Sequence, residues 1–286
     1  MSDRIYPMPK GLEARALAWL TGEGGPAAPA RDASTVMLVR DATDGGPAAG
    51  VEVFMMKRVS TMAFAPSAYV FPGGGVDARD ADEHLPWAGP SPAHWATVLS
   101  APSDASARTL VVAAARELFE ECGVLLAGPG ERRVVEDVRG PGWQAARRRL
   151  LAREQSFAEL LMERNLVLRT DLLAAHAHWI TPCFEPRRYD TRFFVAQVPQ
   201  GQVPDNDNTE ADHARWVRPA DLLAEMELGS AVLFPPTVAQ MEALAGASDA
   251  ASCVASPPSF RPILAEPIRR GDETALLVRA TPEDHS

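Results

Sequence analysis

The sequence predicts an α+β fold in which a mixed β-sheet is layered against helices. Two observations support this prediction. Segments with strand character and segments with helical character follow one another without strict alternation or internal repeats. The composition, 46% hydrophobic and 23% charged residues over 286 positions, is typical of a globular chain with one large domain or two small ones.

The expected elements follow from local patterns. Two apolar, β-branched runs at 34–40 and 51–58 flank a glycine-rich stretch and predict a hairpin. Further strands are expected at 189–199 and 215–217. Helices are expected at 108–121, 142–165, 218–229 and 235–247. Residues 78–107 are rich in Pro, Ala, Ser and Asp and show weak periodicity, so they predict a long loop with one helical turn at most.

Charge and cysteine usage exclude several classes of protein. A net charge of −10 argues against binding nucleic acid or an anionic membrane through bulk charge. No apolar run approaches the roughly 18 residues expected of a membrane span. The three cysteines are far apart and form no C-x-x-C motif, which favours a reducing, cytoplasmic location.

Residues 116–124, "RELFEECGV", place three acidic side chains on one turn of the predicted helix. Glu117, Glu120 and Glu121 are related as i, i+3 and i+4, so they share a face and repel one another. No basic residue follows at i+4 to relieve this repulsion. One interpretation is a solvated acidic helix face. The other is a site for a hard divalent cation with oxygen ligands, Mg²⁺ or Mn²⁺.

A glycine turn, "FPGGG" at 71–75, precedes this helix. Together the two motifs resemble the Nudix box, in which Gly, five residues, Glu and seven residues precede Arg-Glu-aliphatic-any-Glu-Glu-any-Gly-aliphatic. The second half of the box matches at 116–124 without exception. The resemblance implies a Nudix-type α/β/α sandwich with a mixed central sheet and helical insertions.

The first half of the box departs from the pattern. Gly74 and Arg116 are 42 positions apart where the box has 14, so 28 residues are inserted. Counted back from Arg116, the position of the first glutamate is Arg108, and Glu83 in the intervening stretch is given no role. An insertion inside the box resembles the Nudix subgroup of peroxisomal coenzyme A diphosphatases. "KRVSTMAFAPSAYVFPGG", "HWITP" and "RRYDTRFF" are also similar to that subgroup.

The resemblance implies a domain organisation. Residues 1–33 would form an N-terminal segment and linker, and 34–247 the Nudix domain. That domain would contain the 78–107 insertion and the helical segment 142–165. Residues 248–286 would be a C-terminal extension.

The resemblance also implies the metal ligands and catalytic residues. Glu117, Glu120 and Glu121 would bind Mg²⁺ or Mn²⁺, with Glu117 the candidate for the general base. The backbone carbonyl of Gly74 would be a further ligand. Arg116 would pair with one of the glutamates and orient it. The predicted catalytic residues are therefore Arg116 and the three glutamates.

Further residues are implied outside the box. Glu210, in a later loop, is expected to be an additional metal ligand, and Asp212 is the alternative candidate for this role. Arg58, Arg188 and Arg192 are expected to bind the substrate phosphates, although structural ion pairs are an equal alternative for Arg188 and Arg192.

Two other features are interpreted as structural. The basic run 147–149 is expected to form a solvated helix face, and His178 to be an ordinary structural residue.

The implied function is hydrolysis of the pyrophosphate bond in a nucleoside diphosphate linked to another group. Coenzyme A or acyl-CoA is the favoured substrate, giving 3′,5′-ADP and 4′-phosphopantetheine. Nudix proteins that act on coenzyme A often carry a second arginine before FPGG, and residues 59–70 contain none. ADP-ribose or a dinucleotide is therefore the alternative substrate, and a non-catalytic Nudix-fold binding protein is the alternative class. The expected partner is a small nucleotide, and a homodimer is allowed.

Overall fold

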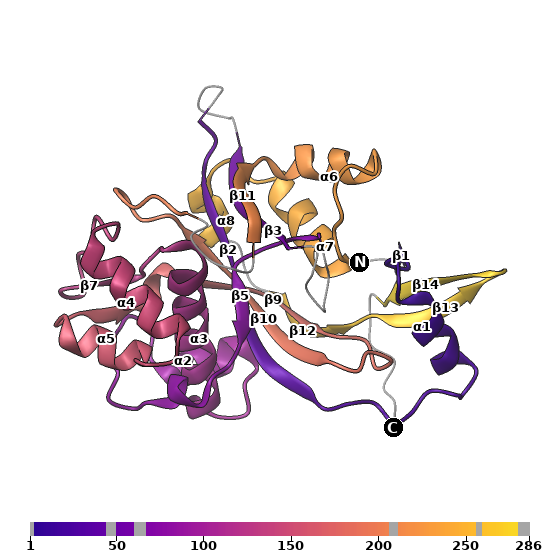
Figure 1. Ribbon diagram of the computed structural model, residues 1–286, viewed down its shortest axis with the longest axis horizontal. Helices are drawn as coiled ribbons and strands as arrows, with labels where there is room; N and C mark the ends of the chain where they lie inside the picture. The colour runs from indigo at the N-terminus through magenta and orange to yellow at the C-terminus, as the bar shows by residue number, and fades with distance from the viewer. Residues whose placement is uncertain (1–2, 44–49, 60–66, 206–210, 256–258, 280–286) are drawn as a thin grey trace.

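A mixed β-sheet with helices on both faces forms the centre of the fold (Figure 1). The computed structural model describes residues 3–43, 50–59, 67–205, 211–255 and 259–279. The strands of the central sheet are β2 (Ala30–Asp41), β3 (Val51–Arg58), β4 (Tyr69–Val70), β5 (Gly73–Gly75), β9 (Ala174–Ile180), β10 (Arg188–Gln197), β11 (Ala211–Val217) and β12 (Ser259–Leu264).

The sheet order is β11-β3-β2-β10-β9-β12, with β4 beside β3 and β5 beside β2. The β2–β10 and β9–β12 pairs are parallel, and the other pairs are antiparallel. The hairpin predicted from residues 34–40 and 51–58 is confirmed, because β2 and β3 pair antiparallel with Val39 opposite Val53. These pairings make the sheet mixed, as predicted.

Alternating side chains of the strands divide the core into two layers. In β2, Met37 and Val39 contribute to one apolar cluster, whereas Val36 and Leu38 contribute to the cluster on the opposite face. All four are fully buried. A strand buried on both faces requires apolar residues at consecutive positions, which explains the continuous apolar run in this segment.

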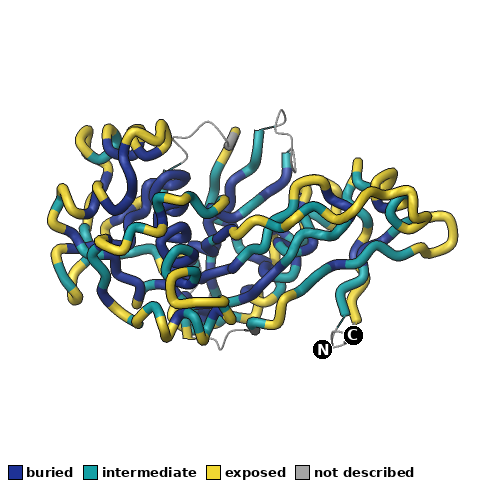
Figure 2. The backbone as a smooth tube through the Cα atoms, turned by 90° about the horizontal axis from the view of Figure 1, so that it is seen from below, coloured by how far each residue is buried: buried dark blue, intermediate teal, exposed yellow. Residues whose placement is uncertain are grey.

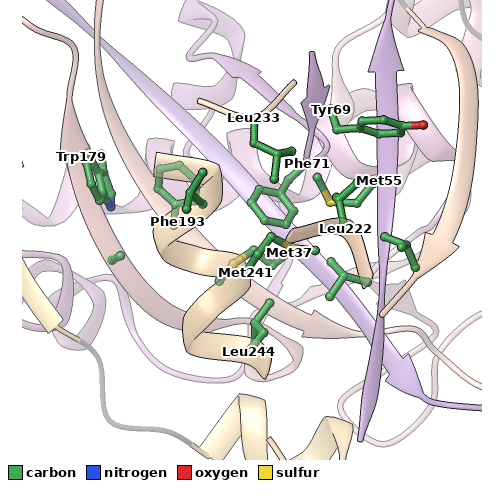
Figure 3. Close-up of a cluster of buried hydrophobic side chains, with 14 of the residues drawn as sticks. Met37, Met55, Tyr69, Phe71, Trp179, Phe193, Leu222, Leu233, Met241 and Leu244 are labelled. Carbon is green, nitrogen blue, oxygen red and sulfur yellow. The ribbon is translucent and has the colours of Figure 1, made fainter. Parts of the chain in front are cut away.

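Three helices cover the first face: α6 (Pro219–Glu227), α7 (Pro235–Ala245) and α8 (Ala250–Ala255). Figure 3 shows Leu222 of α6 and Met241 and Leu244 of α7 packed against Met37 and Phe193 of the sheet. The helices predicted at 218–229 and 235–247 are therefore confirmed, and they form the layer on this face.

The second face is covered by α2 (Pro92–Leu99) and α3 (Asp104–Cys122). A third apolar cluster lies on the other side of α3 and includes α4 (Pro141–Leu151) and α5 (Phe157–Glu163). A small sheet, β6 (Trp87–Ala88), β8 (Val167–Arg169) and β7 (Ala127–Gly128), joins this region, with the short helices η1 (Ala78–Ala81) and η2 (Thr170–Leu172) nearby. Helix α3 thus lies between two apolar clusters, which explains why most of its residues are buried.

Two local expectations were wrong. The stretch 78–107 contains η1, β6, α2 and the start of α3 rather than a loop, because Leu85, Trp95 and Leu99 are buried and hold it against the domain. The segment 142–165 forms two helices rather than one. The chain turns at Arg153, whose φ is 59°, and α5 restarts with a capping box at Ser156.

The two ends of the chain meet in a separate small sheet. Strand β1 (Arg4–Pro7) pairs with β14 (Glu273–Val278), which pairs with β13 (Glu266–Arg270), and α1 (Glu13–Leu20) packs against them. This lobe projects from the central sheet and is largely exposed or half-buried (Figure 2). Within the described ranges, no helix is both long enough and apolar enough to cross a bilayer.

Candidate active site

Helix α3, which carries the acidic cluster, has clear signals at both ends. Ser103 caps its N-terminus by accepting a hydrogen bond from the Ser106 backbone N–H at 3.1 Å. Gly123 ends it with φ of 68°, a left-handed conformation that favours glycine. The helix predicted at 108–121 is confirmed and begins four residues earlier because of the serine cap.

Arg116 and the three glutamates are buried, with exposed fractions of 7% for Arg116, 9% for Glu117 and 8% each for Glu120 and Glu121. The interpretation of a solvated acidic helix face is therefore wrong. Buried carboxylates require partners, because the loss of hydration penalises their charged form. The partners come from Arg116 and from the glycine turn.

Arg116 is at the centre of this ion-pair cluster. Its Nη1 donates to Glu117 Oε1 at 2.7 Å and to Glu120 Oε2 at 3.0 Å. Its Nε and Nη2 donate to the two carboxylate oxygens of Asp80 at 2.7 and 3.0 Å, and Nη2 also donates to the Gly75 carbonyl at 3.0 Å. The guanidinium is thereby held in one orientation beside the glutamates.

The buried negative charge in this cluster exceeds the positive charge. One guanidinium faces the three carboxylates of Asp80, Glu117 and Glu120. Burial raises the pKa of Glu117 to about 7, with the charge of Arg116 opposing the shift and Glu120 adding to it. Burial also raises the pKa of Glu120, again opposed by Arg116. For Arg116, burial acts against the charged form, but the hydrogen bond to Asp80 and the surrounding carboxylates raise its pKa overall.

The glycine turn approaches the cluster closely. Strand β5 pairs with β2 through Gly73, Gly74 and Gly75. The Gly73 backbone N–H donates to Glu121 Oε2 at 2.6 Å. A Cβ at position 74 would lie 2.6 Å from Glu117 Oε1, so only glycine fits there without moving this carboxylate.

The donor set fits a hard divalent cation. It consists of buried carboxylate oxygens whose negative charge Arg116 does not fully balance, next to a backbone that carries no side chain. Within the part of the chain that the structure describes, no three Asp, Glu, His or Cys side chains converge as a ready-made metal cluster. Arg116 Nη1 lies between Glu117 and Glu120, so their oxygens are turned toward the guanidinium.

Asp80 is the residue of the cluster that the sequence analysis missed. It is 1% exposed, and in addition to Arg116 it accepts a hydrogen bond from the Asp77 backbone N–H. The signal was present, since five residues separate Gly74 from Asp80, as the box requires between its glycine and first glutamate. The assignment of that position to Arg108 was wrong. Arg108 instead donates to the carbonyls of residues 82, 83 and 85. The 28 extra residues thus follow Asp80.

Replacing Asp80 by Asn should destabilise the protein. Loss of one partner of a buried ion pair typically costs about 3–5 kcal/mol. We expect the lower end of this range, since Arg116 keeps Glu117 and Glu120. Urea unfolding would measure the change. Asp137→Asn is the control, because the Asp137–Arg139 pair is exposed and should contribute little. Equal free energies of unfolding for the two variants would contradict this role.

The remaining predicted metal ligands and Arg58 are placed only in part. Glu210 lies outside the described residues. Asp212 is exposed on β11, next to that segment. Arg58 ends β3, where its backbone N–H donates to the Ala68 carbonyl. Roles for these residues stay predictions.

The arginines of β10 have partners away from the glutamates. Arg188 donates to the carbonyls of Thr181 and Ala28, at 3.0 and 2.7 Å. Arg192 is buried, pairs with Asp190 and donates to the Leu99 carbonyl. His178, interpreted as a structural residue, joins this cluster with its Nε2 2.5 Å from Asp190 Oδ1. Phosphate binding by Arg188 and Arg192 stays a prediction.

Comparison with known proteins identifies the family. The model of the NUDT19 Nudix domain matches residues 91–244, more than half of the chain. The chain therefore belongs to this Nudix family and is a Nudix hydrolase, an enzyme class that acts on phosphorus-containing acid anhydrides and generally uses divalent metals. The predicted Nudix resemblance and α+β fold are thereby confirmed.

Individual relatives agree with this assignment. The chain is 28% identical to the acyl-coenzyme A diphosphatase NUDT19 of Homo sapiens over 226 residues, which cover 66% of this chain and 59% of that protein. It is 28% identical to a nudix hydrolase of Caenorhabditis elegans over 236 residues, or 82% of this chain and 68% of that protein. The chain thus spans about three fifths of the length of the human relative.

A solved structure is also similar. A NUDIX hydrolase from Alicyclobacillus acidocaldarius has a TM-score of 0.65 and 27% identity, with 82% of this chain and 99% of that chain covered. Because nearly all of that chain is covered, the similarity extends well beyond the region of the box.

Proposed function

We propose that this protein is a coenzyme A or acyl-CoA diphosphatase. It would hydrolyse the pyrophosphate bond with Mg²⁺ or Mn²⁺ and release 3′,5′-ADP and 4′-phosphopantetheine or its acyl ester. The observation that carries the catalytic part is the buried cluster of Glu117, Glu120 and Glu121 against the bend of Gly73 and Gly74. The substrate class is supported by relatives named acyl-coenzyme A diphosphatases.

Each residue has a distinct role in this proposal. Glu117, Glu120 and Glu121 would hold the metal, which neutralises phosphate charge and acidifies a bound water. The Gly73 backbone N–H donates to one carboxylate oxygen of Glu121 and holds this side chain against the glycine turn. Asp80 and the Gly75 carbonyl hold Arg116, which orients Glu117 and Glu120. Glu117 is the proposed acceptor of a proton from the attacking water, since its carboxylate lies in the same buried cluster as Glu120 and Arg116.

A substrate panel tests the proposal. Purified protein with Mg²⁺ would be incubated separately with coenzyme A, a medium-chain acyl-CoA, ADP-ribose and a dinucleotide, and the products identified by mass spectrometry. We expect 3′,5′-ADP from both coenzyme A substrates, at a higher kcat/KM than for the other two compounds. Turnover of ADP-ribose alone would refute the coenzyme A assignment but would agree with the assignment as a Nudix hydrolase.

ADP-ribose or dinucleotide hydrolysis is the second candidate. It is favoured by one observation, the absence of a second arginine between Arg58 and the FPGG motif. The same metal cluster would serve either substrate, so only the panel separates them. A cytoplasmic location and a homodimer stay predictions.

A further inference from the structure

The C-terminal end of the catalytic helix lacks a cation of its own. The last turn of α3 contains no basic residue, although it carries Glu120 and Glu121. The final carbonyls of a helix have no partner within it and favour a nearby positive charge. Because α3 lies between two apolar clusters, this charge must come from another buried side chain.

Arg147 of α4 supplies that charge. Its side chain is buried, 2% exposed, whereas Arg148 and Arg149 beside it are exposed. The expectation of a solvated basic face is therefore wrong for Arg147. Its Nε donates to the Glu120 carbonyl at 2.8 Å, and its Nη1 donates to Asp205 Oδ1 at 2.5 Å. The guanidinium thus bonds the backbone of a residue whose carboxylate belongs to the candidate metal site.

The loop after β10 is fixed to the same place. The Asp205 backbone N–H donates to the Cys122 carbonyl at 3.0 Å. The Gln202 side chain is buried; its Oε1 accepts from the Leu125 N–H at 2.8 Å, and its Nε2 donates to the Leu125 and Val135 carbonyls. The end of α3, helix α4 and this loop therefore meet at Arg147 and Asp205.

The fit at this junction is close. A Cβ at Gly123 would lie 3.1 Å from Arg147 Nη1 and 3.3 Å from Asp205 Oδ2, so the ion pair packs directly against the glycine that ends the helix. Arg147 Nη2 is buried and, among the described residues, has no hydrogen-bond partner. Apolar residues of similar size often replace buried ion pairs without loss of stability. Stability alone therefore does not explain why a charged side chain is buried at position 147.

We propose that Arg147 and Asp205 are positioning residues for the hydrolysis, which fix the backbone of Glu120 and Glu121 so that their carboxylates meet the metal. This proposal rests on the metal-dependent function proposed above. Neither residue contacts the reacting atoms. They act through the helix end, because a displacement of about 1 Å away from the chemistry can lower a rate by roughly 100-fold.

The test compares Arg147→Met, Arg147→Lys and the double variant R147M/D205L with the wild type. Mn²⁺ affinity by calorimetry is the main measurement, with kcat, KM and Tm beside it. We expect Arg147→Met to weaken Mn²⁺ binding by about 10–100-fold, the range typical for residues that orient metal ligands. The value of kcat should fall similarly while KM changes less. Arg147→Lys should restore part of the affinity, since its ammonium can reach one of the two acceptors.

The double variant separates positioning from folding. It replaces the ion pair by apolar side chains, so we expect its Tm to stay near that of the wild type. Its affinity for Mn²⁺ should nevertheless be as low as that of Arg147→Met. Arg148→Met, on the exposed side of the same helix, is the control and should match the wild type. Normal Mn²⁺ affinity and kcat in the stable double variant would overturn the proposal. A wild type that neither binds Mn²⁺ nor cleaves any diphosphate would instead refute the proposed function.

Discussion

Replacing Glu121 by Gln should lower kcat for pyrophosphate hydrolysis by about 1,000-fold. A bound metal contributes several kcal/mol to such a transition state, and about 1.36 kcal/mol corresponds to a factor of ten in rate. Glutamine has nearly the same shape and can still accept the hydrogen bond from the Gly73 N–H. The change would therefore remove the charge of a proposed metal ligand and leave the local packing in place.

The fold of this variant should be intact. Glu117 and Glu121 are one turn apart, so loss of one charge relieves repulsion between like charges. Steady-state kinetics at saturating Mg²⁺ would measure the rate, and thermal unfolding would confirm the fold. Glu163→Gln on α5, whose carboxylate is exposed, is the matched control. A kcat within threefold of the wild type would place the active site elsewhere.

Replacing Gly74 by Ala should lower kcat by about 100-fold with little change in stability, because roughly 1 Å of misplacement has this effect. The added Cβ would lie 2.6–2.8 Å from the three carboxylate atoms of Glu117, closer than van der Waals contact allows. Those atoms are the end of a flexible side chain. The protein can therefore accommodate the methyl group by moving the carboxylate rather than the backbone.

The neighbouring glycine provides the control. A Cβ at Gly75 would meet no atom within 4 Å, so Gly75→Ala should change kcat far less than Gly74→Ala. Crystal structures of the two variants would show whether Glu117 has moved. An active Gly74→Ala variant with Glu117 in its original position would contradict the close approach described above.

The sequence predicted the layers of this protein well, because burial on both faces leaves a direct pattern. The continuous apolar run of β2 and the proline-initiated helices α6 and α7 are examples. Helix α3 was also predicted correctly, since the Nudix motif is contiguous there. Local signals were sufficient wherever the structure depends on residues close together in the chain.

Contacts between distant segments could not be predicted in the same way. Asp80 reaches Arg116 across 36 positions, and Arg147 reaches Asp205 across 58. A basic run on an amphipathic helix predicts solvent exposure, and tertiary packing buries one of three adjacent arginines. Asp80 could have been found by counting forward from Gly74. At helical spacing Arg147 shares a face with Trp143 and Leu150, so the periodicity of the segment could have separated it from Arg148.

The arrangement explains how an insertion inside the box can be accommodated. Asp80 lies before the inserted residues and Arg116 after them, and their ion pair closes the box across the insertion. Leu85 of the inserted segment packs on the outer side of α3 together with α4 and α5, whereas Trp95 and Leu99 of α2 pack between the sheet and α3.

Manganese binding measured by electron paramagnetic resonance tests the central claim most directly. The wild-type protein, titrated with Mn²⁺ in the presence of a non-hydrolysable diphosphate, should immobilise the ion in a saturable manner. The double variant E120Q/E121Q should leave it free in solution at the same concentrations. Equal Mn²⁺ binding by the two proteins, or none by the wild type, would contradict a metal site built from these glutamates.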